Sequence, residues 1–423
     1  MPTARPDTAT IASGAALWAG RDAPSYSVVT VESDGIITPG SQPSSRWYGN
    51  ALYTSWVDSI GRTGITRYDR ATGTPERTVL SLTNQDNSHN NGSIEFLPDG
   101  KVLVAWSKHN SSEGCQVRVS SSAYDVGAFG SAVALTDSGR QTSYADTWKL
   151  SQTGKIYVES RVQISGLNMI RKVWRTSDGV TLDSPTTWVT NPSQRPYPKF
   201  LSDGVSRVHI VSTTGGPNDV ACGLHYAYMQ LDENDVERFY AIDGTSLGTS
   251  GLNTASVSAF VSSASGDNWS YDLAFGPDGE LWLIYVHFPN GSEATDQRLM
   301  FVKTTGGRAA WGTPVQVAVI GAKLYTSENY SHAGAVFDAT DPTIMWACLR
   351  NGNPKHEVFK YTTDDNGATW PQAEQITSGS AQDNFQPMSP PGHNGYCPVV
   401  WITGTYTSWD AGFSTSVKAL IRD

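Results

Sequence analysis

A short motif, in which a polar turn ending in glycine precedes an apolar strand, recurs about seven times and constrains the fold more than any other feature. The clearest copy spans 97–106, where Pro-Asp-Gly is followed by Lys-Val-Leu-Val-Ala-Trp. Short runs of Val, Ile, Tyr, Trp and Thr bounded by Gly, Pro, Asn and Asp predict β-strands, and helical spacing of apolar residues is nearly absent. The other copies lie at 48–56, 151–158, 202–211, 277–285, 341–346 and 395–401.

The spacing of these copies predicts the architecture. They recur at intervals of roughly 50 to 75 residues, the scale of a four-stranded propeller blade with variable loops. Length alone would suggest about three domains of roughly 150 residues each. The repeat instead predicts an all-β fold, a seven-bladed β-propeller of four-stranded antiparallel blades that occupies 1–423 as a single domain. We expect the N-terminal segment of about 45 residues to complete the closing blade.

A second recurring element supports a propeller. The segment 363–370 matches the Asp-box pattern Ser/Thr-x-Asp-x-Gly-x-Thr-Trp, and partial copies occur at 176–179 and 304–307. In this pattern the carboxylate and the glycine shape a hairpin turn, and the tryptophan packs between blades. We therefore expect Asp365 to be a turn residue and not a catalytic acid.

Charge and cysteine usage exclude several classes of protein. Thirty basic and forty acidic residues give a net charge of −10, which disfavours a nucleic-acid partner because phosphate binding needs a basic surface. No apolar run is long enough to cross a membrane, and no secretory leader is visible. The four cysteines are far apart and form no C-x-x-C pair, so we expect no metal site built on them. Buried free thiols are the expected state, with one or two disulfides as the alternative.

Polar side chains that could carry chemistry flank two neighbouring repeats. His89 precedes the apolar run of 97–106 and His109 follows it, so the two histidines flank one hairpin and can meet at one mouth of the central channel. Tyr144 and Arg161 flank the next repeat in the same way. A proton-transfer pair beside a cation is what proton abstraction next to a carboxylate requires.

These residues, together with the segment Arg-Pro-Tyr-Pro-Lys-Phe at 195–200, resemble the seven-bladed propeller polysaccharide lyases typified by ulvan lyases, a group with related α-L-rhamnosidases. The resemblance extends from about residue 45 to the C-terminus, and order and spacing carry it. It implies that His89 and Tyr144 exchange protons with the substrate, with the acid and the base left unassigned, that Arg161 neutralises a uronate carboxylate, and that His109 supports the site. The substrate-binding residues it implies are Asn90, Arg195, Tyr197, Lys199 and His332.

The reaction implied by this resemblance is β-elimination at a uronic acid of the rhamnose-glucuronate type, as in ulvan or gum arabic. It requires no cofactor, and the many Asp and Asn turns leave room for a structural calcium ion but supply no spaced ligand loop. The expected partner is an anionic polysaccharide or oligosaccharide, with no nucleic acid and no membrane. We expect a monomer that is secreted or extracellular, with a virion-associated protein as the alternative location.

Two other functions fit the same fold. A non-catalytic glycan-binding propeller, such as a phage receptor-binding protein, would use tryptophan-rich loops to stack on sugars. An α-L-rhamnosidase-type glycoside hydrolase would act on the same substrate but cleave its glycosidic bond by hydrolysis. A sialidase would need three arginines, a Tyr nucleophile with a Glu partner and an Asp acid, and its Arg-Ile-Pro start is absent here.

Overall fold

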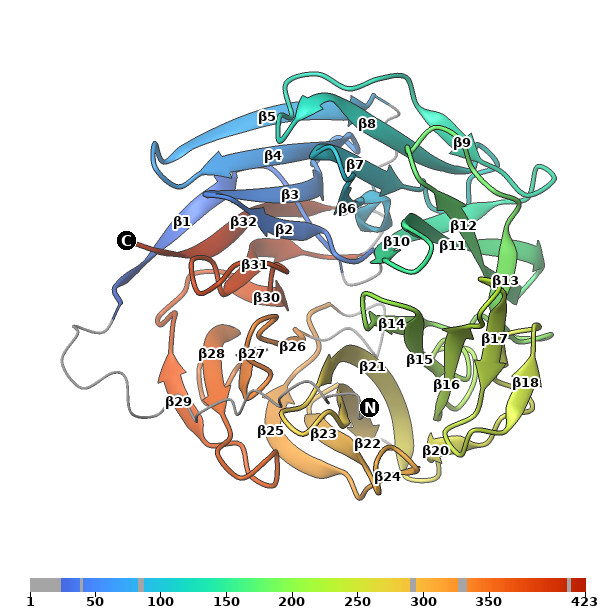
Figure 1. Ribbon diagram of the computed structural model, residues 1–423. Coiled ribbons are helices and arrows are strands. Elements are labelled where there is room, and N and C mark those ends of the chain that lie inside the picture. The colour runs from blue at the N-terminus through green and yellow to red at the C-terminus, as the bar shows by residue number, and fades with distance from the viewer. Residues whose placement is uncertain (1–23, 39–40, 83–86, 290–293, 326–332, 409–411) are drawn as a thin grey trace, which may run out of the picture.

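The computed structural model describes residues 24–38, 41–82, 87–289, 294–325, 333–408 and 412–423. Within these ranges the chain forms seven sheets arranged in a ring about a central axis (Figure 1), which confirms the predicted seven-bladed β-propeller. The helical structure in these ranges is one 3-10 turn, Ser88–Asn90, so no described helix is long enough to span a membrane.

The first four sheets follow one another along the chain. Sheet 1 holds β2 (Ser45–Tyr48), β3 (Ala51–Val57), β4 (Thr63–Asp69) and β5 (Thr74–Ser81), and sheet 2 holds β6 (Ser93–Phe96), β7 (Lys101–Trp106), β8 (Cys115–Ala123) and β9 (Val133–Leu135). Sheet 3 holds β10 (Thr142–Leu150), β11 (Lys155–Ser165), β12 (Asn168–Thr176) and β13 (Thr186–Thr190), to which the short β19 (Leu252–Asn253) adds in parallel. Sheet 4 holds β14 (Pro198–Ser202), β15 (Arg207–Thr213), β16 (Leu224–Leu231), β17 (Glu237–Tyr240) and β18 (Ser246–Gly248), with β20 (Ala259–Val261) on β16.

The last three sheets complete the ring. Sheet 5 holds β21 (Gly266–Phe275), β22 (Leu281–Pro289), β23 (Gln297–Thr305), β24 (Ala310–Trp311) and β25 (Val315–Gly321). Sheet 6 holds β26 (Ala335–Phe337), β27 (Ile344–Leu349), β28 (Glu357–Thr362) and β29 (Gln372–Gln375), and sheet 7 holds β30 (Asp383–Met388), β31 (Val399–Tyr406), β32 (Phe413–Arg422) and β1 (Tyr26–Glu32). Sheets 3, 4 and 5 therefore exceed the four strands predicted for every blade, because short loop strands add to them.

The apolar strand of each repeat is the second strand of its blade, counted from the channel (Figure 1). These strands are β3, β7, β11, β15, β22, β27 and β31. All seven residues of β3 are buried, and so are the last five of β7. Such a strand is covered on both faces by neighbouring blades, so its sequence is apolar without alternation. The strands that line the channel precede these, and their sequences carry a weaker repeat.

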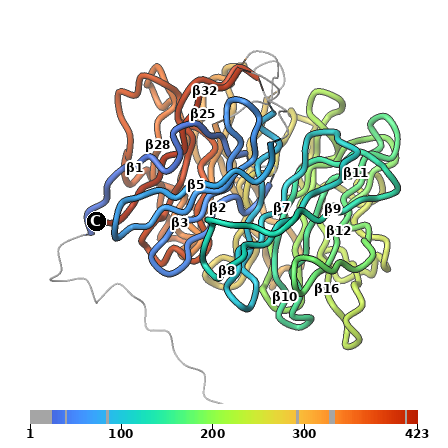
Figure 2. The backbone as a smooth tube through the Cα atoms, turned by 90° about the horizontal axis from the view of Figure 1, so that it is seen from above, coloured from blue at the N-terminus to red at the C-terminus, as the bar shows by residue number. Residues whose placement is uncertain are grey.

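The two ends of the described chain close the ring within one sheet. β1 pairs with β32 in antiparallel register, with Tyr26 opposite Arg422 and Val29 opposite Ala419. β1 is thus the outermost strand of a sheet whose inner strands come from the C-terminus, and both views place the C-terminus beside the start of β1 (Figures 1 and 2). This ladder therefore holds the two ends of the described chain together in one blade.

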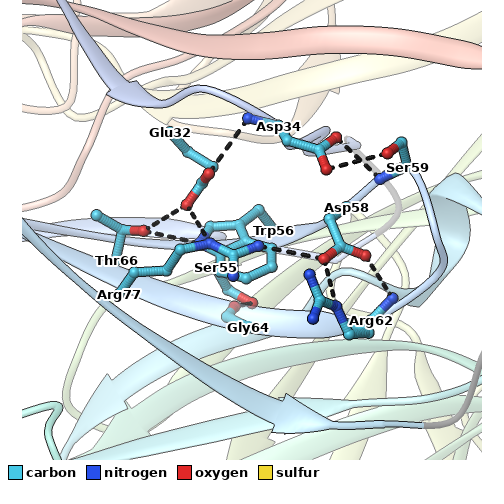
Figure 3. Close-up of polar contacts among 10 residues, drawn as sticks. All are labelled: Glu32, Asp34, Ser55, Trp56, Asp58, Ser59, Arg62, Gly64, Thr66 and Arg77. Carbon is cyan, nitrogen blue, oxygen red and sulfur yellow. Dashed lines mark hydrogen bonds and ion pairs between the residues drawn. The ribbon is translucent and has the colours of Figure 1, made fainter.

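A cluster of charged residues ties the closing sheet to the first blade (Figure 3). The carboxylate of Glu32, only 5% exposed, accepts hydrogen bonds from the Thr66 hydroxyl at 2.9 Å and from Arg77 Nε at 3.0 Å. Arg77 also donates to Asp58 at 3.2 Å, and its guanidinium lies 3.9 Å from the centre of the Trp56 ring. Because Glu32 ends β1 and its partners belong to sheet 1, the cluster holds two blades together.

Replacement of Glu32 by alanine is therefore expected to lower the free energy of unfolding by about 1.5 to 3 kcal/mol, since it removes the charged acceptor of Thr66 and one of the two carboxylates that pair with Arg77. The midpoint of urea unfolding measures this change. Asp34→Ala serves as the control, because Asp34 accepts only from exposed Ser59, and it should cost about 1 kcal/mol or less. Equal midpoint shifts in both variants would show that the cluster does not stabilise the closure.

The segment 363–370 forms a turn between β28 and β29. One carboxylate oxygen of Asp365 accepts from the backbone N–H of Thr369 at 2.8 Å, and Asp365 also accepts from the hydroxyls of Thr363 and Thr369. These bonds lower the pKa of Asp365 to about 2, and Trp370 packs against Phe301 of sheet 5. Asp365 is a turn residue, as predicted, and all four cysteines are buried free thiols.

Candidate active site

The two histidines come from opposite ends of one hairpin and stack against each other. His89 lies in the 3-10 turn before β6, and His109 follows the end of β7. Because β6 and β7 are antiparallel, the residues before the first strand and after the second lie at the same end of the hairpin. The two imidazole rings are 4.5 Å apart between centroids, with an angle of 15° between their planes.

Asn87 connects both histidines. Its Oδ1 accepts from the backbone N–H of His89 at 3.0 Å and lies 2.7 Å from His89 Nδ1, while its Nδ2 lies 3.2 Å from His109 Nδ1. Asn87 is 3% exposed and is the N-cap of the 3-10 turn. Asn90 supports the same pair, because its Oδ1 accepts from the backbone N–H of His109 at 2.8 Å.

Tyr144 reaches this pair through a bulge in β10. The pairing of β10 with β11 shifts between Ser143 and Asp146, so Tyr144 and Ala145 together lie opposite Ser160. Tyr144 has a φ of +66°, a left-handed conformation that costs a non-glycine residue about 1 to 2 kcal/mol. The bulge places the phenol ring 5.1 Å from the His89 ring, and strain of this kind concentrates at functional sites.

Arg161 lies beside Tyr144 on the neighbouring strand. It is opposite Ser143 in the β10–β11 ladder, and its guanidinium carbon lies 4.7 Å from the centre of the Tyr144 ring. Its Nη2 donates to Asn110 Oδ1 at 3.1 Å and to Ser143 Oγ at 3.0 Å, and its Nη1 donates to the Tyr197 hydroxyl at 3.3 Å. Arg161 is 2% exposed, and these bonds hold its guanidinium next to the phenol and the histidines.

Burial keeps the phenol protonated, and burial together with nearby positive charges keeps the histidines neutral. Burial lowers the pKa of His89 well below its ordinary value, and the charges of His109, Arg161 and Arg195 lower it further. Burial and the same two arginines lower the pKa of His109 to about 3. Burial raises the pKa of Tyr144, although the nearby arginines oppose this shift. The site therefore has a positive field within a protein whose net charge is −10.

The predicted substrate-binding residues fall into different places. Tyr197 lies 6.2 Å from Tyr144 between ring centroids, and Arg195 acts electrostatically on both histidines while it pairs with Asp219. Asn90 is 1% exposed and so supports His109 from within the protein. Lys199 faces a different group of residues, and His332 lies outside the described residues.

Lys199 belongs to a buried network further along the channel. Its neighbours are Asp146 and Asp272, and burial lowers its pKa to about 8 while both carboxylates oppose that change. Burial raises the pKa of each carboxyl to about 6. A cavity of about 490 Å³ lies here, lined by Asp146, Asp272 and the downstream halves of several inner strands. The lining of this cavity does not include His89, His109 or Tyr144, although Arg171 acts electrostatically on both Lys199 and Tyr144.

Asn87 and Arg171 belong to the site although the sequence pattern does not single them out. The Arg171 guanidinium lies 5.3 Å from the Tyr144 ring centre, on β12, and pairs with Glu159 at 3.2 Å. Asparagine is a preferred N-cap residue, and this preference could have indicated Asn87. Within the described ranges, no three His, Cys, Asp or Glu side chains are grouped to hold a metal ion.

The fold and this cluster define a seven-bladed β-propeller with a polar site at one end of its central channel. The model of the BNR repeat-containing family matches residues 51–318, more than half of the chain, and the protein belongs to that family. No curated protein sequence matches the chain.

Solved structures with the same fold include two kinds of carbohydrate-processing enzyme. A PL25 ulvan lyase bound to -[GlcA(1-4)Rha3S]- aligns with a TM-score of 0.70 and 10% identity, over 92% of this chain and 97% of that chain. The α-L-arabinofuranosidase of Fusarium graminearum, with an iminosugar inhibitor, aligns with a TM-score of 0.50 and 11% identity, over 80% of this chain and 95% of that chain. At these identities the likeness establishes the fold, which lyases and hydrolases share.

Proposed function

We propose that the protein is a polysaccharide lyase that cleaves the glycosidic bond at C4 of a uronic acid by β-elimination. The observation that carries this proposal is the convergence of His89, Tyr144 and Arg161, whose rings and guanidinium lie about one sugar ring apart. The structural likeness to an ulvan lyase agrees with this function, and the resemblance in the order of site residues points to a substrate of the rhamnose-glucuronate type.

The protonation states support a separate role for each member of the proposed proton-transfer pair. A base must be neutral before the reaction, and the low pKa of His89 keeps its imidazole neutral at neutral pH. An acid must carry a proton, and the raised pKa of Tyr144 keeps the phenol protonated. His89 would remove the proton from C5, the C4–O bond would break as the C4–C5 double bond forms, and the Tyr144 phenol would protonate the departing oxygen.

Arg161 would neutralise the carboxylate at C6. Removal of the C5 proton places negative charge on the carboxylate, and a fixed cation in a water-poor site stabilises that charge. A guanidinium has five N–H groups, and the three hydrogen bonds to Asn110, Ser143 and Tyr197 hold it in place without using them all. Arg195, whose charge acts on the same histidines, would add to the field that holds the anionic polymer.

The composition of the cluster favours elimination over hydrolysis. Most glycoside hydrolases need two carboxyl groups that flank the scissile bond. Among the described residues, the charges of a histidine and two arginines lower the pKa of His89. Glu159 is fully buried and paired with Arg171, and Asp219 is paired with Arg195. These two carboxylates therefore do not form a catalytic pair beside His89.

The decisive experiment is incubation with ulvan, gum arabic and other uronic-acid polymers while ultraviolet absorbance is recorded. The 4,5-unsaturated uronate produced by elimination absorbs because its double bond is conjugated with the carboxylate. A rise in absorbance supports the lyase. Released reducing sugar without that rise would show a hydrolase, and binding without any product would show a glycan-binding propeller.

Arg161→Lys is expected to lower kcat about 10²- to 10³-fold, because an ammonium group cannot reproduce the hydrogen bonds to Asn110, Ser143 and Tyr197 or the position of the charge. Initial rates of absorbance increase measure this effect. Arg140→Lys is the matched control, since the Arg140 side chain is 41% exposed and pairs with Asp137 at the surface. Equal activities in Arg161→Lys and the control would remove Arg161 from the mechanism.

A further inference from the structure

One hydrogen-bond partner of the Asn87 side chain can act only as a donor. A backbone N–H always donates, and the backbone N–H of His89 points at one terminal atom of the Asn87 side chain at 3.0 Å. That atom must therefore be the amide oxygen, and the other terminal atom is the NH₂ group. This contact fixes the orientation of the amide by its chemistry, which geometry alone often leaves open.

The orientation of the amide then dictates the state of each imidazole. The oxygen that accepts from the His89 backbone also lies 2.7 Å from His89 Nδ1, so Nδ1 must carry a proton and donate to it. The NH₂ group lies 3.2 Å from His109 Nδ1, so that nitrogen must accept and carry no proton. In a neutral imidazole the second nitrogen has the opposite character.

We propose that Asn87 is a positioning residue that imposes opposite tautomers on the two histidines, with the lone pair of His89 on Nε2 and the N–H of His109 on Nε2. His89 Nε2 is then the basic atom, and His109 Nε2–H is a hydrogen-bond donor in the same site. The catalytic consequence rests on the proposed lyase function, whereas the tautomers are a property of the protein alone.

The stacking of the two rings is consistent with this arrangement. Rings 4.5 Å apart repel when both are protonated, and burial together with Arg161 and Arg195 also disfavours protonation. Among the described residues, the groups that face the pair include Tyr144 on β10, Arg161 on β11 and Arg195 before β14.

Asn87→Asp tests the proposal while it preserves the structural role of the side chain. Aspartate caps a helical turn as well as asparagine does, so the 3-10 turn and the His89 backbone contact should persist. The NH₂ donor, however, becomes an acceptor. We expect His109 to shift its proton to Nδ1 in order to donate to the new oxygen, and the negative charge to raise the pKa of both histidines by about one to three units.

The measurement is nitrogen NMR of protein labelled at histidine, in which the two ring nitrogens of each tautomer give distinct shifts. The chain has eight histidines, and the His89→Gln and His109→Gln variants assign the two signals. The expected result is Nδ1–H at His89 and Nε2–H at His109 in the wild type, with Nδ1–H at both in Asn87→Asp. An Nε2–H tautomer at His89 in the wild type, or an unchanged His109 in Asn87→Asp, overturns the proposal.

A second measurement tests the consequence for catalysis. In Asn87→Asp the acid limb of the pH profile of kcat/KM should move to higher pH by about one to three units, because the base is harder to deprotonate. An unchanged acid limb would contradict the role of Asn87 in setting the basicity of His89. If the wild type eliminates no uronic-acid polymer, the proposed function fails, and the NMR result still decides whether Asn87 sets the tautomers.

Discussion

Replacement of Tyr144 by phenylalanine is expected to lower kcat for elimination by about 10²- to 10⁴-fold, the usual contribution of a general acid. The substitution removes only the phenol hydroxyl. The ring should keep its contacts with His89 at 5.1 Å and with the Arg161 guanidinium at 4.7 Å, so the bulge and the fold should persist. Initial rates with a uronic-acid polymer, followed by absorbance of the unsaturated product, measure the loss.

The control for this variant is Tyr48→Phe. Tyr48 ends β2, stacks on Tyr124 and is 43% exposed, so loss of its hydroxyl should leave the rate within about twofold. Substrates with a good leaving group at C4 give a finer test, because they need less help from an acid. Their rates should fall less in Tyr144→Phe than the rates of natural polymers, and equal losses for both would contradict the assignment of Tyr144 as the acid.

Replacement of His89 by glutamine is expected to abolish elimination to a similar degree, about 10²- to 10⁴-fold, because an amide cannot accept the C5 proton. Glutamine keeps a polar group in the turn before β6, so folding should be retained, as circular dichroism and urea unfolding would show. His225→Gln is the matched control, since His225 lies on β16, the third strand of its blade, and bonds to Thr214 and Val257. Full activity in His89→Gln would exclude this residue as the base.

The same assignment predicts the pH dependence of the wild-type protein. The pKa of His89 lies well below its ordinary value of 6.5, so the neutral, basic form persists as the pH falls below that value. The rate constant kcat/KM should therefore stay level through pH 6.5 and decline only at more acidic pH. A profile that falls off at or above 6.5 would show that the site does not depress the pKa of its base.

The sequence predicted a structural feature correctly where the physical cause of that feature is local or repeats along the chain. The turn and strand motif predicts seven blades because each second strand is buried on both faces, which forces an apolar run such as that of β7. The pairing of His89 with His109 was also predictable, because antiparallel strands return the chain to the same end. The turn role of Asp365 follows from its own bonds to Thr363 and Thr369.

Other parts of the site depend on contacts between residues that share no local pattern. No sequence signal marks the bulge that turns Tyr144 toward His89, because it arises from a register shift between β10 and β11. The segment from Arg195 to Lys199 also shows that the sequence does not reveal which residues share a site. Arg195 and Tyr197 lie near the cluster, whereas Lys199 faces Asp146 and Asp272, since successive residues along the chain enter different surroundings in the channel.

The sequence by itself determined the architecture and the hairpins that supply the candidate site, because burial between blades repeats with the chain and leaves a periodic record. Only the tertiary structure decided which polar groups meet and in which protonation state. The Asn87 amide, the left-handed conformation of Tyr144 and the positive field of Arg161 and Arg195 act across separate strands and loops. Hydrogen bonds, burial and the interactions between charges depend on the distances between side chains. Those distances are set by the way the blades pack together in the folded protein.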